Sequence, residues 1–359
     1  MTRTRRAVAL TAIFLGTTAL VLAIALPTFL VPSLKKVPSD VKIAVTMDAH
    51  NARLVDVQPL VRGEAVHTSS GVDLQIHADI RSIPPTGDND VTLSAATRMS
   101  RLSPNTPPEL VIAYVDQITI DRRTAEPLAG TPARTAYNIG ESPQPKARKG
   151  FQYTFPIGLS KRSYPYHDVN SRTEGTARYL DDNRTVEGMR LYHLRVDVPR
   201  TNLEPIAGND GRLSLSARAW GLPGTGNVTF DRYYSSTIDL WVEPRSGVLV
   251  VQNLTMHRDL VGSGRTFTEI DADFHMTPDT IAQTAALAKK NKRMLDWGET
   301  YAPTALGVLG GLLLITGVVT LIRGRRRDST TQGPDGLLPV GVGEGLVDVK
   351  VPDLVDQVV

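Results

Sequence analysis

The run Tyr153–Asp168, YTFPIGLSKRSYPYHD, contains the residue types that a hydrolase uses. Ser160 could act as a nucleophile, His167 as a base and Asp168 as the acidic partner of that base. A serine hydrolase also places its nucleophile on a tight Gly-x-Ser-x-Gly turn, whereas this segment reads Ile-Gly-Leu-Ser-Lys-Arg. The three residues are also too close along the chain for their spacing to predict a triad. We therefore expect a structural edge or a binding surface here, and no catalysis.

Aromatic residues in the same run favour the structural interpretation. Four rings are present, on Tyr153, Phe155, Tyr164 and Tyr166. Pro156 and Pro165 interrupt the run, and proline in a sheet is confined to edges and bends. We expect the rings to line a pair of strands.

Two groups of polar residues have a spacing that could hold a divalent cation. The groups are Asp271, Asp273 and His275, and His193, Arg195 and Asp197. Within each group the residues are two apart, so they would share one face of a strand, and carboxylate and imidazole ligands suit several metals. The same alternation is typical of any solvated strand face. We predict no catalytic, cofactor-binding or metal-binding residues, and no cofactor.

Two long uncharged stretches, 7–31 and 302–322, predict membrane-spanning helices. As a helix, the shorter stretch would be about 31 Å long, close to the thickness of the hydrocarbon core of a bilayer. The first stretch has an alternative reading as a cleaved signal peptide. Since the apolar region of a signal peptide is usually about 7–15 residues, an uncleaved anchor is favoured.

Charge and cysteine content restrict the compartment and the chemistry. Arg3, Arg5 and Arg6 precede the first stretch and arginines at 323–327 follow the second, so both termini are predicted to be cytoplasmic. The central region would then be extracytoplasmic. The chain has no cysteine, which excludes disulfides, thiolate metal sites and cysteine nucleophiles. A net charge of +3 without a basic motif predicts no nucleic-acid partner.

The central region alternates apolar and polar residues as antiparallel strands do. Examples are 71–80 (GVDLQIHADI), 211–220 (GRLSLSARAW) and 268–276 (TEIDADFHM). Period-two alternation predicts strands with one face on a core and one in water. Either two related β-subdomains or one long curved sheet fits this pattern. Thr277 as N-cap and Pro278 in the first turn predict a helix that leads back to the membrane.

The predicted organisation is a mainly β, antiparallel domain between two terminal transmembrane helices. Its parts are a cytoplasmic N-terminus (1–6), a first transmembrane helix (7–31), β-subdomains 35–150 and 151–276, a juxtamembrane helix (277–301), a second transmembrane helix (302–322) and a cytoplasmic basic cluster with an acidic disordered tail (323–359). Gly307 and Gly311 form a small-residue motif for helix packing. We expect it to pack on the first helix through one of Ala12, Gly16, Ala19 and Ala23, with homodimerisation as the alternative.

Four segments resemble a known family of envelope proteins. They are ITIDRRTAEP, GFQYTFPIGLSKRSYPYHD, VEGMRLYHLRVDVP and DLWVEPRSGVLV, set between two terminal spans, and they resemble the actinobacterial PorA family, a group of two-span membrane proteins with a domain of unknown function. The resemblance implies an integral cytoplasmic-membrane protein with a large extracytoplasmic domain, and it supplies no catalytic residues. A closed transmembrane barrel needs no apolar helices, and a two-helix hairpin encloses no pore.

The function expected from these observations is binding or scaffolding in the bacterial cell envelope, not catalysis. Curved sheets with an apolar concave side would suit envelope lipids, an analogy with lipid-carrier half-barrels at the level of fold. The expected partners are membrane lipid and an amphiphilic envelope component or an envelope protein. The alternatives are a pore-forming, porin-like oligomer and an envelope enzyme.

Overall fold

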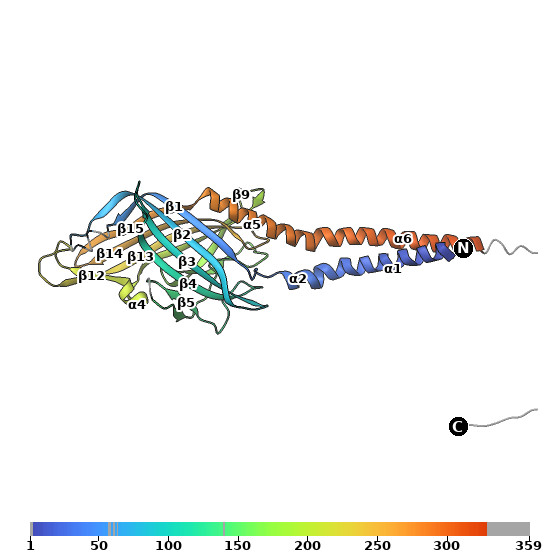
Figure 1. Cartoon of the computed structure of the whole chain (residues 1–359), viewed down its shortest axis with the longest axis horizontal. Helices are drawn as coiled ribbons and strands as arrows, with labels where there is room; N and C mark the ends of the chain where they lie inside the picture. Colours follow the sequence, from blue (N-terminus) through green and yellow to red (C-terminus); the bar gives the residue numbers. More distant parts are fainter. Residues whose placement is uncertain (1–2, 57–58, 60–61, 63, 139–140, 329–359) are drawn as a thin grey trace, which may run out of the picture. The chain divides into compact units, whose positions relative to one another are not determined.

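The computed structural model describes residues 3–56, 59, 62, 64–138 and 141–328 (Figure 1). Residues Leu22–Ala305 form one structural unit, which contains the β domain, and the remaining parts of the two terminal helices form a second. The predicted acidic tail beyond residue 328 lies outside the described residues.

Antiparallel strands dominate the first unit. They are β1 (Lys42–Val55), β2 (Thr68–Thr86), β3 (Asp90–Leu102), β4 (Glu109–Asp121), β5 (Ala133–Ala136), β6 (Gln144–Lys146), β7 (Tyr164–Asp168), β8 (Thr173–Asp181), β9 (Thr185–Val186), β10 (Met189–Arg190), β11 (Tyr192–Asn202), β12 (Arg212–Ser216), β13 (Asn227–Val242), β14 (Leu249–Gly262) and β15 (Arg265–Met276). Short helical turns at α4 (Glu204–Ala207) and η2 (Gly208–Gly211) precede β12. The predicted fold class, a mainly antiparallel β domain with terminal helices, is confirmed.

One sheet holds nearly all of these strands. Within the described residues its order is β6-β5-β4-β3-β2-β1-β15-β14-β13-β11-β8-β7, with β12 paired to β13 and the β9–β10 hairpin separate. Of the two arrangements that the sequence left open, the structure therefore has the single sheet. Its halves before and after residue 150 join where β1 pairs with β15, for example Met47 opposite Met276.

The sheet curls until its two edge regions approach each other. In Figure 1 the strands β2–β4 cross over β13–β15. Lys146 on β6 donates to the carbonyl oxygen of Arg172, beside β7, at 3.4 Å, and the Tyr137 hydroxyl donates to the Val169 carbonyl at 3.2 Å. The segment between β6 and β7 follows the same gap, since Phe151 exchanges backbone hydrogen bonds with Pro165 and His167. The concave face therefore encloses an interior.

Alternation along the strands decides which side chains face that interior. Val72, Leu74 and Ile76 of β2 are buried, as predicted. The inward face of β15 is buried as well, at Ile270, Ala272, Phe274 and Met276. The prediction for 211–220 was wrong beyond Ser216, where β12 ends and a turn brings Trp220 into a separate cluster with Phe230 and Leu260.

The two terminal helices are longer than the predicted spans. The first comprises α1 (Arg3–Ala25), a π-turn η1 (Leu26–Leu30) and α2 (Val31–Leu34). The second runs without a break through α5 (Pro278–Asp296), the π-turn η3 (Trp297–Tyr301) and α6 (Ala302–Asp328). Among the described residues, these two are long and apolar enough to cross a membrane. The predicted cap is confirmed, since the Thr277 hydroxyl accepts from the Thr280 amide at 3.3 Å.

Small residues bring the two terminal helices into contact within the second unit. A Cβ atom added to Gly310 would lie 2.8 Å from the carbonyl oxygen of Gly16, and one added to Gly317 would lie 2.9 Å from that of Ala9. The predicted packing through Gly16 is confirmed. The predicted partner Gly311 was wrong, because it faces open space and Gly310 makes the contact.

Candidate binding cavity

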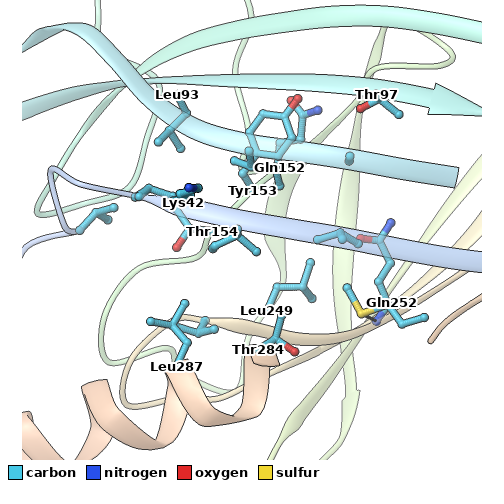
Figure 2. A pocket seen from close by; sticks show the side chains of 18 of the residues that line it. Lys42, Leu93, Thr97, Gln152, Tyr153, Thr154, Leu249, Gln252, Thr284 and Leu287 are labelled. Carbon is cyan, nitrogen blue, oxygen red and sulfur yellow. Dashed lines mark hydrogen bonds between the residues drawn. The ribbon is translucent and has the colours of Figure 1, made fainter. Parts of the chain in front are cut away.

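The interior of the β domain contains an apolar cavity of about 490 Å³. Its walls come from both halves of the sheet, including Leu93 of β3 and Leu249 of β14, and from helix α5. Figure 2 shows Thr284 and Leu287 of α5 directed into the cavity, with Leu93 and Thr97 of β3 on the opposite side. We call this space the apolar cavity.

The strand pattern explains why the interior is not filled. Ala78 and Ile80 continue the inward-facing series of β2 beyond Ile76, yet they are only half-buried because they line the apolar cavity. Further along the same strand, Leu74 is fully enclosed in the core. One strand face therefore changes from packed core to cavity wall, and the alternation in the sequence is the same in both parts.

A segment between β6 and β7 closes one side of the apolar cavity. Gln152, Tyr153 and Thr154 line it, as Figure 2 shows. The Oε1 atom of Gln152 is buried and has no hydrogen-bond partner among the described residues, which leaves an acceptor free in the lining.

A buried ion pair anchors this segment to the sheet. Asp116 of β4 is fully buried, and the Arg148 guanidinium donates to its two carboxylate oxygens at 2.9 and 2.7 Å. The hydroxyls of Tyr153 and Thr135 donate to the same carboxylate at 2.7 and 2.6 Å. Removing one partner of such a network leaves an uncompensated buried charge, so these residues fix the cavity wall in place.

The sequence prediction missed Asp116, although the chain carries a signal for it. Asp116 lies between Tyr114 and Ile118 on one face of β4, where the neighbouring inward positions are aromatic or aliphatic. A single carboxylate inside an apolar alternation requires a buried partner. The partner, Arg148, lies in a loop 32 residues away, and nothing local in the sequence identifies it.

One end of the apolar cavity is polar. Tyr114, Tyr166 and Asp168 line it, and burial raises the pKa of all three side chains above their ordinary values. Asp168 accepts a hydrogen bond from the Ser171 amide at 2.9 Å. The cavity is therefore amphipathic, with aliphatic walls and a hydrogen-bonding end.

The rim consists of residues that adjoin the terminal helices in sequence. Lys36, Asp40 and Lys42 follow the first helix, and Lys290 and Met294 precede the end of α5. Met294 is exposed. The rim combines cationic and apolar side chains, the combination found where proteins meet lipid head groups.

Ion pairs join the two chain segments at this rim. Glu299 pairs with Lys35 and, at 2.7 Å, with Arg245 from the turn after β13. Arg245 also pairs with Asp296 at 3.0 Å. The two segments that lead to the terminal helices are therefore held together beside the cavity.

The hydrolase-like residues do not form a catalytic arrangement. Ser160 is exposed, and its amide donates to the hydroxyl of Tyr164 at 2.8 Å. His167 is buried, and its Nδ1 atom has no hydrogen-bond partner among the described residues. Burial and the nearby Arg148 charge lower the pKa of His167 to about 4. Phe155 and Tyr164 are buried with their rings 6.0 Å apart. Tyr164 and Tyr166 lie on strand β7 as predicted, whereas Tyr153 and Phe155 precede that strand.

The members of the two strand-face groups contact side chains on their own or on an adjacent strand. The Nε2 atom of His193 lies 2.6 Å from Asp239, which also accepts from Arg195 at 2.8 Å. Asp273 contacts His275 at 3.2 Å, whereas the nearest histidine to Asp271 is His257 on β14. Neither group gathers its three predicted members around one point. Oppositely charged neighbours on adjacent strands stabilise the outer face of the sheet.

Comparison with known proteins gives a consistent relationship over most of the chain. The family model described as Porin PorA matches residues 8–319. The chain belongs to the PorA porin family. This confirms the predicted resemblance, and it makes the chain a membrane protein of the cell envelope.

Two relatives in this family cover nearly the same length. Porin PorA of Corynebacterium amycolatum is 27% identical over 370 residues, which cover 85% of this chain and 96% of the relative. Porin PorA of Corynebacterium resistens (strain DSM 45100 / JCM 12819 / GTC 2026 / SICGH 158) is 27% identical over 401 residues, which cover 88% of this chain and 96% of the relative.

Proposed function

We propose that the β domain binds an amphiphilic component of the cell envelope and holds its apolar part in the apolar cavity. The observation that carries the proposal is the cavity itself. A volume of about 490 Å³ is within the range of roughly 300–1,000 Å³ that is usual for small-molecule sites. A protein that served only as a scaffold would fill the interior of its sheet with side chains, because empty apolar volume reduces stability.

The rim supports an amphiphile over a wholly apolar ligand. Lys36, Lys42 and Lys290 give it three ammonium groups against the carboxylate of Asp40. Anionic head groups attract lysines near a membrane surface by about 1 kcal/mol for each residue. Because these residues adjoin the terminal helices in sequence, the rim would lie within reach of a membrane leaflet.

In this proposal the β domain is extracytoplasmic, both termini are cytoplasmic, and the domain binds without catalysing a reaction. The arginines on the outer flanks of the two helices support the orientation. The exposure of Ser160 and the burial of His167 support binding over hydrolysis.

The test is to purify the full-length protein from its native membranes and to identify bound molecules by native mass spectrometry and lipid extraction. We expect an amphiphile that remains bound when bulk lipid is removed. A protein that carries no such molecule, and that takes up none from added envelope lipid extract, would refute the proposal.

Pore formation is the second candidate, and the observation that favours it is the name Porin PorA, which both the family and its two relatives carry. Two helices enclose no aqueous path, so a pore would need several copies of the chain. Full-length protein in planar bilayers distinguishes the candidates. Stepwise ion conductance that depends on protein concentration would favour the pore.

A further inference from the structure

A second cavity of about 370 Å³ lies next to the apolar cavity. The two share four lining residues, Ile112, Tyr114, Asn170 and Met256. The two cavities therefore adjoin at these side chains. The second cavity is lined mainly by polar side chains, on the side of the domain that carries α4, and we call it the polar chamber.

Guanidinium groups dominate the charge of the polar chamber. Arg172, Arg232 and Arg258 line it together with one carboxylate, Asp210. Arg172 donates to Asp210 at 2.9 Å and lies over the ring of Tyr137, 3.3 Å from its centroid. The other two arginines share Glu269, at 3.0 Å from Arg232 and 2.7 Å from Arg258. Three positive charges are thus compensated by two negative ones.

The chamber also contains unmet hydrogen-bonding capacity. The hydroxyl of Tyr234 is buried and has no partner among the described residues. Burial, together with the neighbouring charge of Arg232, lowers the pKa of Arg258. Arg172 has a backbone φ of +58°, a conformation that few non-glycine residues adopt. With this backbone conformation Arg172 lines the chamber.

We propose that the polar chamber binds the anionic group, a phosphate or a carboxylate, of the amphiphile whose apolar part occupies the apolar cavity. Arginine suits both anions because its planar donors match two oxygens at once. The proposal rests on the proposed function and adds the chemistry of the head group. The ligand would pass the wall at Tyr114 and Asn170, which belongs to both cavities.

The test uses the full-length protein in phosphatidylcholine nanodiscs and two photoreactive probes. One probe is hexadecyl phosphate with a diazirine in its chain, and the other is the neutral hexadecanol with the same chain. The measured quantity is the probe concentration at which photolabelling is half-maximal. For the wild-type protein we expect the phosphate probe to label at a lower concentration than the neutral probe.

Arg172→Gln is the principal variant, and Arg200→Gln is its matched control. Arg200 also pairs with an aspartate, Asp259 at 3.6 Å, and also lies over a tyrosine, Tyr233, but it lines neither cavity. A hydrogen bond to a charged group contributes about 1.5–3 kcal/mol, so Arg172→Gln should raise the half-maximal concentration of the phosphate probe about tenfold or more. The neutral probe should be unaffected by either variant.

Tyr234→Phe provides a second variant that conserves the fold, since it removes a hydroxyl without a partner. It should weaken labelling by the phosphate probe and leave the neutral probe unchanged. Excess inorganic phosphate that competes with the phosphate probe in the wild type, and not in Arg172→Gln, would mean that the chamber also accepts free phosphate. An unaltered preference for the phosphate probe under the same excess would mean that the anion must be attached to a chain.

Two results would overturn the inference in distinguishable ways. Equal labelling by both probes, unchanged in Arg172→Gln, would show that the chamber is no anion site while the apolar cavity still binds amphiphiles. No saturable labelling by either probe would refute the proposed function, and this inference with it.

Discussion

At the residue scale, the aromatic cluster around Phe155 determines the stability of the segment that first resembled a hydrolase site. Phe155 is fully buried, and its ring lies 5.6 Å from Phe151 and 6.0 Å from Tyr164. Replacing Phe155 by Ala should lower the free energy of unfolding by about 3 kcal/mol, since it removes buried apolar surface and leaves a cavity. Chemical denaturation of the full-length protein in nanodiscs measures this loss.

Ser160→Ala is the control in the same segment. Because Ser160 is exposed, its replacement should leave the unfolding transition unchanged. Hydrolysis of an ester or amide substrate that the wild type performs and Ser160→Ala does not would contradict the structural interpretation.

The buried His167 predicts a dependence of stability on pH. Its pKa is lowered from 6.5 to about 4, by burial first and then by Arg148. The unfolded chain therefore takes up a proton before the folded protein does, so stability that is complete above pH 6.5 is lost as the pH falls toward 4. The loss should approach about 3 kcal/mol, at 1.36 kcal/mol for each pKa unit.

His167→Gln should remove this part of the pH dependence. Asp168 has the opposite effect, since its raised pKa adds stability as the pH falls, but it is present in both proteins and cancels in the comparison. The measurement is the unfolding free energy at pH 7 and pH 4.5 for both proteins. If the unfolding free energy changed equally with pH in the two proteins, the role assigned to His167 would be contradicted.

At the element scale, sequence periodicity predicted parts of β2, β12 and β15, and capping residues predicted the start of α5, but neither indicated where the interior is empty. The alternation from Val72 to Ile80 is uniform, although Leu74 is packed core and Ile80 lines the apolar cavity. That difference depends on what lies opposite each residue, which is set by strands more than 100 residues away. Likewise, Asp116 is buried, and its arginine partner Arg148 is 32 residues distant.

The contact between α1 and α6 gives a prediction with a matched control. In Gly310→Ala the added methyl group would meet the Gly16 carbonyl at 2.8 Å, so the helices must separate. Overpacking of this kind costs about 1–3 kcal/mol, and we expect a lower midpoint of thermal unfolding in nanodiscs. Gly311→Ala places the same methyl group in open space and should unfold like the wild type. Equal midpoints of thermal unfolding for the two variants would contradict the packing of α6 on α1 through Gly310.

At the scale of the whole molecule, the sequence predicted the order of membrane helices and β domain, but it left the sheet topology open. The pairing of β1 with β15 joins residues more than 200 positions apart, and no local pattern specifies it. The division near residue 150 separates β6 from β7, which stand at opposite ends of the strand order. Curling of the whole sheet brings these ends together and creates the interior.

The orientation in the membrane gives a prediction at this scale. We propose from the flanking arginines that this end is cytoplasmic. Alkaline phosphatase fused after Arg327 should then be inactive, because the enzyme does not fold in the cytoplasm. A fusion near Gly150 should be active. A strongly active fusion after Arg327 would reverse the orientation.

The most direct test of the central claim, that the apolar cavity holds an amphiphile, is to fill the cavity and count bound molecules. Leu287 of α5 lines the cavity, so Leu287→Trp should occupy part of its volume. The control is Leu180→Trp on β8, where the leucine is exposed and lines neither cavity. Native mass spectrometry of the full-length proteins should find the bound amphiphile in the wild type and in Leu180→Trp, and much less of it in Leu287→Trp. Equal occupancy in all three proteins, or none in the wild type, would contradict the claim.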